Sequence, residues 1–265
     1  PTASTSPNRN HSIPFTHCLP FLPPLTSLWF HPSEPPRPTT HTTHHPMTTL
    51  REDGRTPLTL RPCSADQGLL NKADGSACFA QGNTVVLAAV YGPCQKIDAT
   101  SFDKGSLDIV YKPADGSPGA SSVERQRLLA QSLRHVVALS SFPQAALNCT
   151  VQVLNDDGST LATAFNAITL ALLDAGIEQN GLVTAVCCAV LANGEICVDP
   201  TTKELDAAVA SMSTAWHSVS GELLACTTSG VFTRAGHKKC QAACQGAAVN
   251  VIGFVRAAFK SRQAD

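Results

Sequence analysis

Short runs of apolar and β-branched residues, separated by glycine and proline, occupy the middle of the chain and predict β-strands. Three of these runs are Gly75–Phe79, Asn83–Tyr91 and Ser106–Lys112. In a fourth, Leu147–Val153, apolar residues alternate strictly with polar ones, as in a strand with one buried face. The pattern therefore predicts a sheet that covers a core on one side.

Helical spacing of apolar residues follows these strands and predicts three helices. The first opens at Ser121 with capping-box spacing to Glu124 and runs to about Ser140, the second ends near Leu173, and the third spans about 234–260 with Thr233 as its N-cap.

The strand pattern returns after residue 180. Strands are predicted at 182–191, 196–198, 207–218 and 222–228, and Asn193-Gly194 is a hairpin signal between the first two. The chain thus contains two similar rounds, each of several strands followed by a helix. This order predicts an α/β fold in the form of an α+β sandwich with an internal pseudo-repeat. Periodicity leaves the strand order open.

Composition divides the chain at about residue 47. Residues 1–46 hold 11 of the 18 prolines and 6 of the 9 histidines, with Arg9, Glu34 and Arg37 as their charged residues. A segment with so many chain breakers cannot bury a core. We expect residues 1–46 to be a disordered leader or a stretch outside the native chain, and residues 47–265 to form the folded domain.

Charge and cysteine content limit the classes of function. The whole chain carries a formal charge of −1 and the leader +1, so residues 47–265 carry −2. Dedicated nucleic-acid-binding domains are usually basic, so any RNA contact must be a local patch. The ten cysteines of 47–265 lie mostly in apolar runs without metal-ligand spacing, which predicts buried thiols in a reducing compartment.

The segment from Val153 to Ala164 reads as a strand, an Asp-Gly turn and a helix whose first residues carry hydroxyl groups. The N-terminus of a helix offers unpaired N–H groups and the positive end of the helix dipole, which suits a phosphate. Gly158, Ser159 and Thr160 are the candidate phosphate-binding residues. Neither arginine nor lysine lies in this turn.

Several motifs occur together in one order. They are Leu50-Arg-Glu-Asp-Gly-Arg55, Leu60-Arg-Pro62, Ala73-Asp-Gly-Ser76, Gln81-Gly-Asn-Thr84, Glu124-x-Gln-Arg-Leu-Leu129 with Leu133-Arg134, and Val153 to Thr163. In order and spacing, this set resembles the RNase PH family over nearly all of residues 50–262. Ala73 to Phe79, Val90-Tyr-Gly-Pro93 and Val198 to Lys203 look most like one branch, the RNase PH-like ring subunits of the eukaryotic RNA exosome.

The resemblance implies a ribosomal-protein-S5-domain-2-like βα fold, with a first half at about 50–176 and a second at about 180–262. It also implies pairwise dimers, a six-membered ring of RNase PH-like subunits around an RNA channel, and cap subunits with S1 and KH domains. The expected locations are the nucleus, the nucleolus and the cytoplasm, with no membrane partner. A homodimer outside the ring stays open as an alternative.

The chain departs from the family where phosphate would bind. Active members have an arginine at the position of Leu161 and a second one at the position of Ser121. Each charged hydrogen bond contributes about 1.5–3 kcal/mol, so losing both arginines should remove most of the affinity for phosphate. The resemblance thus implies a largely non-catalytic subunit that binds RNA and needs no cofactor.

The carboxylates leave two enzymatic alternatives open. Asp199 matches the family's first catalytic aspartate, and Leu205 occupies the position of the second, between Glu204 and Asp206. A one-residue shift would pair Asp199 with Asp206, with Glu204 beside them, as oxygen ligands for Mg²⁺. Such a site would support a metal-dependent nuclease, whereas phosphorolysis would use inorganic phosphate. Alternatively, Asp199 starts a turn, and Glu204 and Asp206 cap the next element of the chain.

Four basic residues are candidates for RNA binding. Lys112, Arg125, Arg127 and Arg134 flank the loop and helix that would face RNA in the family arrangement, and solvated or salt-bridged roles are the alternative. Arg127 and Arg134 lie seven residues apart and therefore share a helix face. For Arg55 and Arg61, a subunit contact and the RNA channel both stay open.

Overall fold

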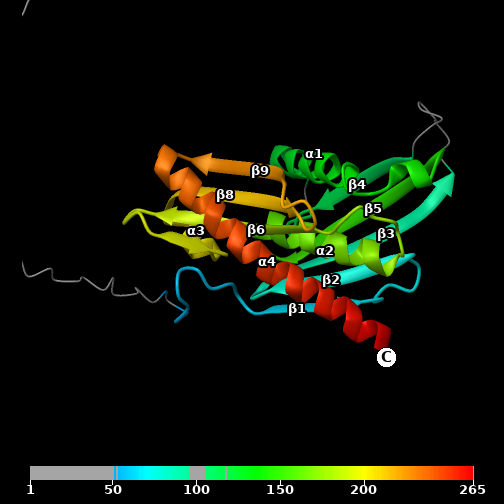
Figure 1. The fold of residues 1–265 in the computed structure, drawn as a ribbon, viewed down its shortest axis with the longest axis horizontal. Helices are drawn as coiled ribbons and strands as arrows, with labels where there is room; N and C mark the ends of the chain where they lie inside the picture. The colour runs from blue at the N-terminus through cyan, green and yellow to red at the C-terminus, as the bar shows by residue number, and fades with distance from the viewer. Residues whose placement is uncertain (1–50, 52, 96–104, 117, 265) are drawn as a thin grey trace, which may run out of the picture. The chain divides into compact units, whose positions relative to one another are not determined.

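A computed structural model describes residues 51, 53–95, 105–116 and 118–264. These residues belong to one unit, Pro46–Asp265, and the expected leader at 1–46 lies outside them. The first sheet has the order β1-β2-β3-β5-β4 (Figure 1). Its strands are β1 (Cys63–Gln67), β2 (Gly75–Gln81), β3 (Thr84–Gln95), β4 (Ser106–Lys112) and β5 (Ala145–Asn155). All neighbours are antiparallel except β4 and β5, which are parallel because a helix connects them.

The second sheet is antiparallel, with the order β7-β6-β8-β9. It contains β6 (Val183–Leu191), β7 (Ile196–Val198), β8 (Ala208–His217) and β9 (Leu223–Gly230). The predicted hairpin at Asn193-Gly194 joins β6 to β7, and Gly194 has a φ of +81°. Glycine supplies that left-handed conformation without steric cost, so this turn confirms the sequence signal.

The helices are α1 (Ala120–Arg134), α2 (Thr160–Asp174), the short α3 (Thr202–Asp206) and α4 (Arg234–Ala264), with a 3₁₀ turn at Leu139–Ser141. Helix α2 packs against β2 and β3 of one sheet and β6 of the other, so it forms the centre of the core. Its polar side chains also hold β6, because the Asn166 amide exchanges bonds of 3.2 and 2.9 Å with the backbone of Ala185.

Helix α4 crosses β6 and reaches β1 of the first sheet (Figure 1). Cys240, Cys244 and Val251 are buried on its inner face, and the rings of Phe254 and Phe79 form a T-shaped pair with their centres 5.9 Å apart. By length and composition alone, Arg234–Arg262 could cross a membrane. In this fold its apolar stripe faces β6 and closes the core of the second sheet.

The mixed α/β class and the two rounds of strands and helix are as predicted, whereas both ends of helix α1 differ from the prediction. Helix α1 starts after Gly119 without a side-chain cap, so the capping box at Ser121 is wrong. It ends at Arg134, because Val137 leaves the helix to pair with Gln179. Strand β1 and helix α3 have no counterpart in the predicted pattern. Thr233 does cap α4, since its hydroxyl accepts the N–H of Gly236 at 3.1 Å.

Candidate functional site

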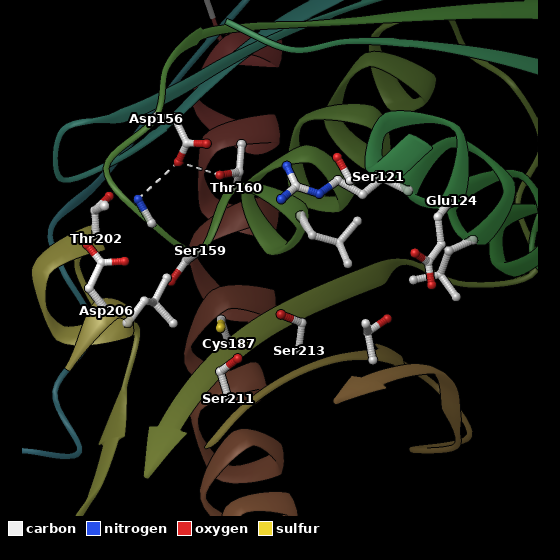
Figure 2. A pocket seen from close by; sticks show the side chains of 16 residues that line it. Ser121, Glu124, Asp156, Ser159, Thr160, Cys187, Thr202, Asp206, Ser211 and Ser213 are labelled. Carbon is white, nitrogen blue, oxygen red and sulfur yellow. Dashed lines mark hydrogen bonds between the residues drawn. The ribbon is translucent and has the colours of Figure 1, made fainter. Parts of the chain in front are cut away.

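A cavity of about 600 Å³ lies between the start of α2, helix α1, helix α3 and strands β6 and β8 (Figure 2). Most of its polar lining consists of hydroxyl groups, with the thiol of Cys187 on β6 and three carboxylates. The hydroxyls belong to Ser121, Ser159, Thr160, Thr202, Ser211, Ser213 and Thr227, and the carboxylates to Glu124, Asp156 and Asp206. The predicted phosphate-binding residues therefore do lie at a cavity.

The turn before α2 fits tightly against the segment that precedes α3. Gly158 has a φ of +82°, and a Cβ atom there would lie 2.6 Å from the carbonyl oxygen of Pro200. Ser159, the N-cap residue, has a φ of +57°, which costs a residue with a side chain about 1 kcal/mol. The Ser159 hydroxyl donates to the Pro200 carbonyl at 3.1 Å, which helps to hold this conformation.

The donors predicted to bind phosphate bond to oxygen atoms of the protein itself. The N–H of Gly158 and the hydroxyl of Thr160 both donate to Oδ1 of Asp156, at 3.1 and 2.5 Å (Figure 2). The hydroxyl of Ser159 is the one that donates to Pro200. A phosphate ion would have to break these bonds before it could use the same donors.

The charges around the cavity also disfavour an anion. Glu124, Asp156 and Asp206 face it, and Arg125 is its one basic residue within the described chain. That guanidinium already donates to the Tyr111 hydroxyl at 3.1 Å and lies 5.9 Å from the centre of the ring. Leu161 and Ser121, where the family resemblance implies an arginine in active members, both line the cavity. Three carboxylates against one guanidinium repel an incoming phosphate.

Asp199, predicted as a catalytic and metal-binding residue, is not among the residues that line the cavity. It is fully buried and pairs with Arg61, with Nη2–Oδ1 and Nε–Oδ2 distances of 2.7 and 2.9 Å. The backbone N–H of Arg61 donates to the same carboxylate at 2.9 Å. Arg61 is therefore a buried structural residue, and the expectation that it lies at a subunit contact or the RNA channel is wrong.

Glu204 is likewise held by an arginine. Both of its carboxylate oxygens accept from Arg51, and Glu204 forms a capping box with Thr201 at the start of α3. Burial opposes ionisation, but the hydrogen bonds from Arg51 and from the Thr201 backbone outweigh it and lower the pKa of Glu204. Glu204 therefore caps helix α3, as in the alternative that the sequence left open, and its carboxylate is engaged by Arg51 instead of a metal ion.

Magnesium does not fit the carboxylate set that the sequence suggested. Asp206 lines the cavity, whereas Asp199 and Glu204 are each paired with an arginine. Across the described ranges, no group of three or more His, Cys, Asp or Glu side chains is placed to hold a metal ion. Asp199 is thus engaged by Arg61, whereas the prediction paired it with Asp206.

The four predicted RNA-binding residues lie in three places. Arg125 lines the cavity, whereas Arg127 and Arg134 border a second hollow of about 370 Å³ between α1 and β4. Arg134 also donates to the carbonyl of Leu107 at 3.1 Å. Lys112 is exposed at the end of β4. The shared helix face of Arg127 and Arg134 is as expected.

Sequence reasoning missed the arginines that hold the carboxylates. Arg61 and Arg51 belong to motifs of the family set, but each is more than a hundred residues from its partner, so spacing gives no sign of the pairs. It also missed Cys187, whose thiol lies at the cavity and is 4% exposed. Burial raises the pKa of this thiol to about 12, which keeps it protonated and unreactive at neutral pH.

Comparison with known proteins agrees with this fold. The family model described as "3′ exoribonuclease family, domain 1", the RNase PH model, matches residues 59–178. The crystal structure of rice Rrp46 is 32% identical and superimposes with a TM-score of 0.76, covering 79% of this chain and all of that one. The chain belongs to the RNase PH family.

Other members of the RNase PH family are similar over parts of their length. The exosome complex exonuclease RRP46 homolog of Arabidopsis thaliana is 38% identical over 155 residues, which cover 58% of this chain and 65% of that relative. This match thus spans just under two thirds of the relative. The Archaeoglobus fulgidus exosome with RNA bound to the active site has a subunit with a TM-score of 0.70 and 19% identity, which shows the shared fold.

Proposed function

We propose that this protein is a ring subunit of the RNA exosome core. The observation that carries the proposal is the likeness to rice Rrp46 over the full length of that chain, together with the exosome names of its relatives. Its partners are then other RNase PH-like subunits, cap proteins with S1 and KH domains, and RNA. The corresponding locations are the nucleus, the nucleolus and the cytoplasm.

Within the ring, the subunit contributes structure and RNA contacts, not phosphorolysis. Attack by inorganic phosphate requires a bound phosphate held by cations and N–H donors. Leu161 and Ser121 supply no charge, and the donors of Gly158, Ser159 and Thr160 are engaged within the protein. Arg127 and Arg134, which share a face of α1, are the basic residues best placed to contact an RNA backbone.

A metal-dependent hydrolytic role has less support. It would need at least two carboxylates to share one ion, and Asp199 and Glu204 each bond to an arginine instead. Asp206 alone is an insufficient ligand set. The chemistry of the donors therefore favours the structural role.

Reconstitution tests the ring assignment. The full chain is co-expressed with the other RNase PH-like exosome subunits of its source, and the complex is sized by light scattering after gel filtration. We expect a stable hetero-oligomer of ring size that contains one copy of this chain. A chain that stays monomeric, or that pairs with itself in the presence of these subunits, would contradict the assignment.

A further inference from the structure

One carboxylate lies at the start of α2, where phosphate was expected to bind. Oδ1 of Asp156 accepts the N–H of Gly158 at 3.1 Å and the hydroxyl of Thr160 at 2.5 Å (Figure 2). Asp156 also lines the cavity beside Ser159 and Leu161. The negative charge thus lies at the positive end of a helix of 15 residues, an arrangement that stabilises both the charge and the helix.

Asp156 accepts from two of the donors predicted to bind phosphate, the N–H of Gly158 and the hydroxyl of Thr160. A third donor, the Ser159 hydroxyl, is bonded to the carbonyl of Pro200, and a Cβ atom at Gly158 would lie 2.6 Å from that same oxygen. An anion at this helix end would therefore compete for these three donors and would also meet the charge of Asp156 at close range. Both effects act against every small oxyanion and depend little on its shape.

We propose that the Asp156 carboxylate takes the place of a bound phosphate at the N-terminus of α2. Its negative charge and its hydrogen bonds then lower the affinity of the cavity for inorganic phosphate and sulfate. This inference rests on the proposed function, in which the subunit does not catalyse phosphorolysis. It attributes the weak binding of phosphate to the charge of Asp156 as well as to the lack of arginine at positions 161 and 121. Asp156 is thus a specificity-determining residue.

A purely structural role for Asp156 is the alternative. An aspartate or asparagine side chain that accepts the N–H two residues ahead forms an Asx turn, and either residue makes it equally well. Asparagine keeps the acceptor oxygen but carries no charge. The Asp156→Asn variant therefore preserves the turn and removes the anion, which separates the two roles.

The test is titration calorimetry of the full chain with inorganic phosphate. Asp156→Asn should tighten the phosphate dissociation constant by about tenfold, the size expected when one charge is removed at a helix N-terminus. Asp156→Ala, which also frees the two donors, should tighten it at least as much. The matched control is Glu124→Gln, which removes one exposed charge from the same cavity without opening the helix end, and it should change the constant by less than about threefold.

Two results would overturn the inference. One is an Asp156→Asn protein that shows the wild-type circular dichroism spectrum and binds phosphate no more tightly than wild type. The other is a Glu124→Gln protein that gains as much affinity as Asp156→Asn, because then the net charge of the cavity alone decides. Ring assembly is measured separately, so failure of this inference is distinguishable from failure of the proposed function.

Discussion

The guanidinium of Arg61 and the carboxylate of Asp199 form a buried, two-bond ion pair across 138 positions of sequence. The same guanidinium donates to the carbonyls of Asp157 and Gly158 at 2.8 and 3.3 Å. Arg61 therefore ties the segment before β1 to the end of β7 and to the turn that starts α2. The Asp199 carboxylate is therefore part of a buried ion pair that joins three segments of the fold.

Loss of Arg61 should destabilise the protein strongly. Arg61→Met removes the two-bond partner of the buried Asp199 carboxylate and leaves it with the guanidinium of Arg55 at 4.0 Å, which should cost up to about 3–5 kcal/mol of unfolding free energy. Urea unfolding measures the change. Arg127→Met, an exposed site on α1, should change stability by less than about 0.5 kcal/mol. The double variant Arg61→Met/Asp199→Asn should recover part of the loss, and equal stability of wild type and Arg61→Met would refute this role.

The pair of Glu204 and Arg51 should make stability fall in acid. The pKa of Glu204 is lower in the folded protein than its ordinary value of 4.5, so the unfolded state takes up the proton first as the pH falls. The stabilisation is therefore complete above pH 4.5 and is lost as the pH falls through the folded-state pKa. Glu204→Gln should be less stable than wild type at neutral pH, and the difference should shrink in acid. A difference that stays constant during acidification would argue against the pair.

Restoring one arginine should not create phosphorolysis. Leu161→Arg supplies one guanidinium to the cavity. The second arginine position still holds Ser121, and the carboxylate of Asp156 still lies at the N-terminus of α2. We expect no release of nucleoside diphosphates from RNA by Leu161→Arg. The triple variant Leu161→Arg/Ser121→Arg/Asp156→Asn is the one most able to bind phosphate. Activity in the single variant would show that Ser121 and Asp156 do not matter.

Arg127 and Arg134 should carry part of the affinity for RNA. For single-stranded RNA, each phosphate contact contributes about 0.7 to the slope of log affinity against log salt concentration. Arg127→Ala/Arg134→Ala should therefore lower that slope by about 1.4, as measured by fluorescence anisotropy. The control is Arg256→Ala/Lys260→Ala, the same charge change on exposed residues of α4. An unchanged slope in the first variant would place the RNA elsewhere.

Local sequence patterns predicted most of the fold because burial repeats along each element. The strand of Leu147–Val153 alternates as its burial does in β5, and Asn193-Gly194 marked the β6–β7 hairpin. Strand β1 was missed because Cys63–Gln67 is short and mixed in polarity, and its pairing with β2 comes from the tertiary structure. Helix α1 ended earlier than predicted because a bridge to Gln179 draws Val137 out of the helix.

The sequence named residues that the fold brings together, but it did not reveal their bonds. Ser159, Thr160 and Asp206 line one cavity. Which oxygen each hydroxyl bonds to depends on the left-handed backbone at Ser159 and on the neighbouring Pro200, which only the folded chain brings together. For the same reason the arginine partners of Asp199 and Glu204 could not be predicted.

The most direct test of the central claim is phosphate dependence of RNA degradation. The purified full chain is incubated with an RNA that has a single-stranded 3′ tail, with and without inorganic phosphate, and nucleoside diphosphates are quantified by chromatography. We predict intact RNA and no nucleoside diphosphate in both samples. Nucleoside diphosphate that appears with phosphate, and is lost when phosphate is withdrawn, would contradict the account.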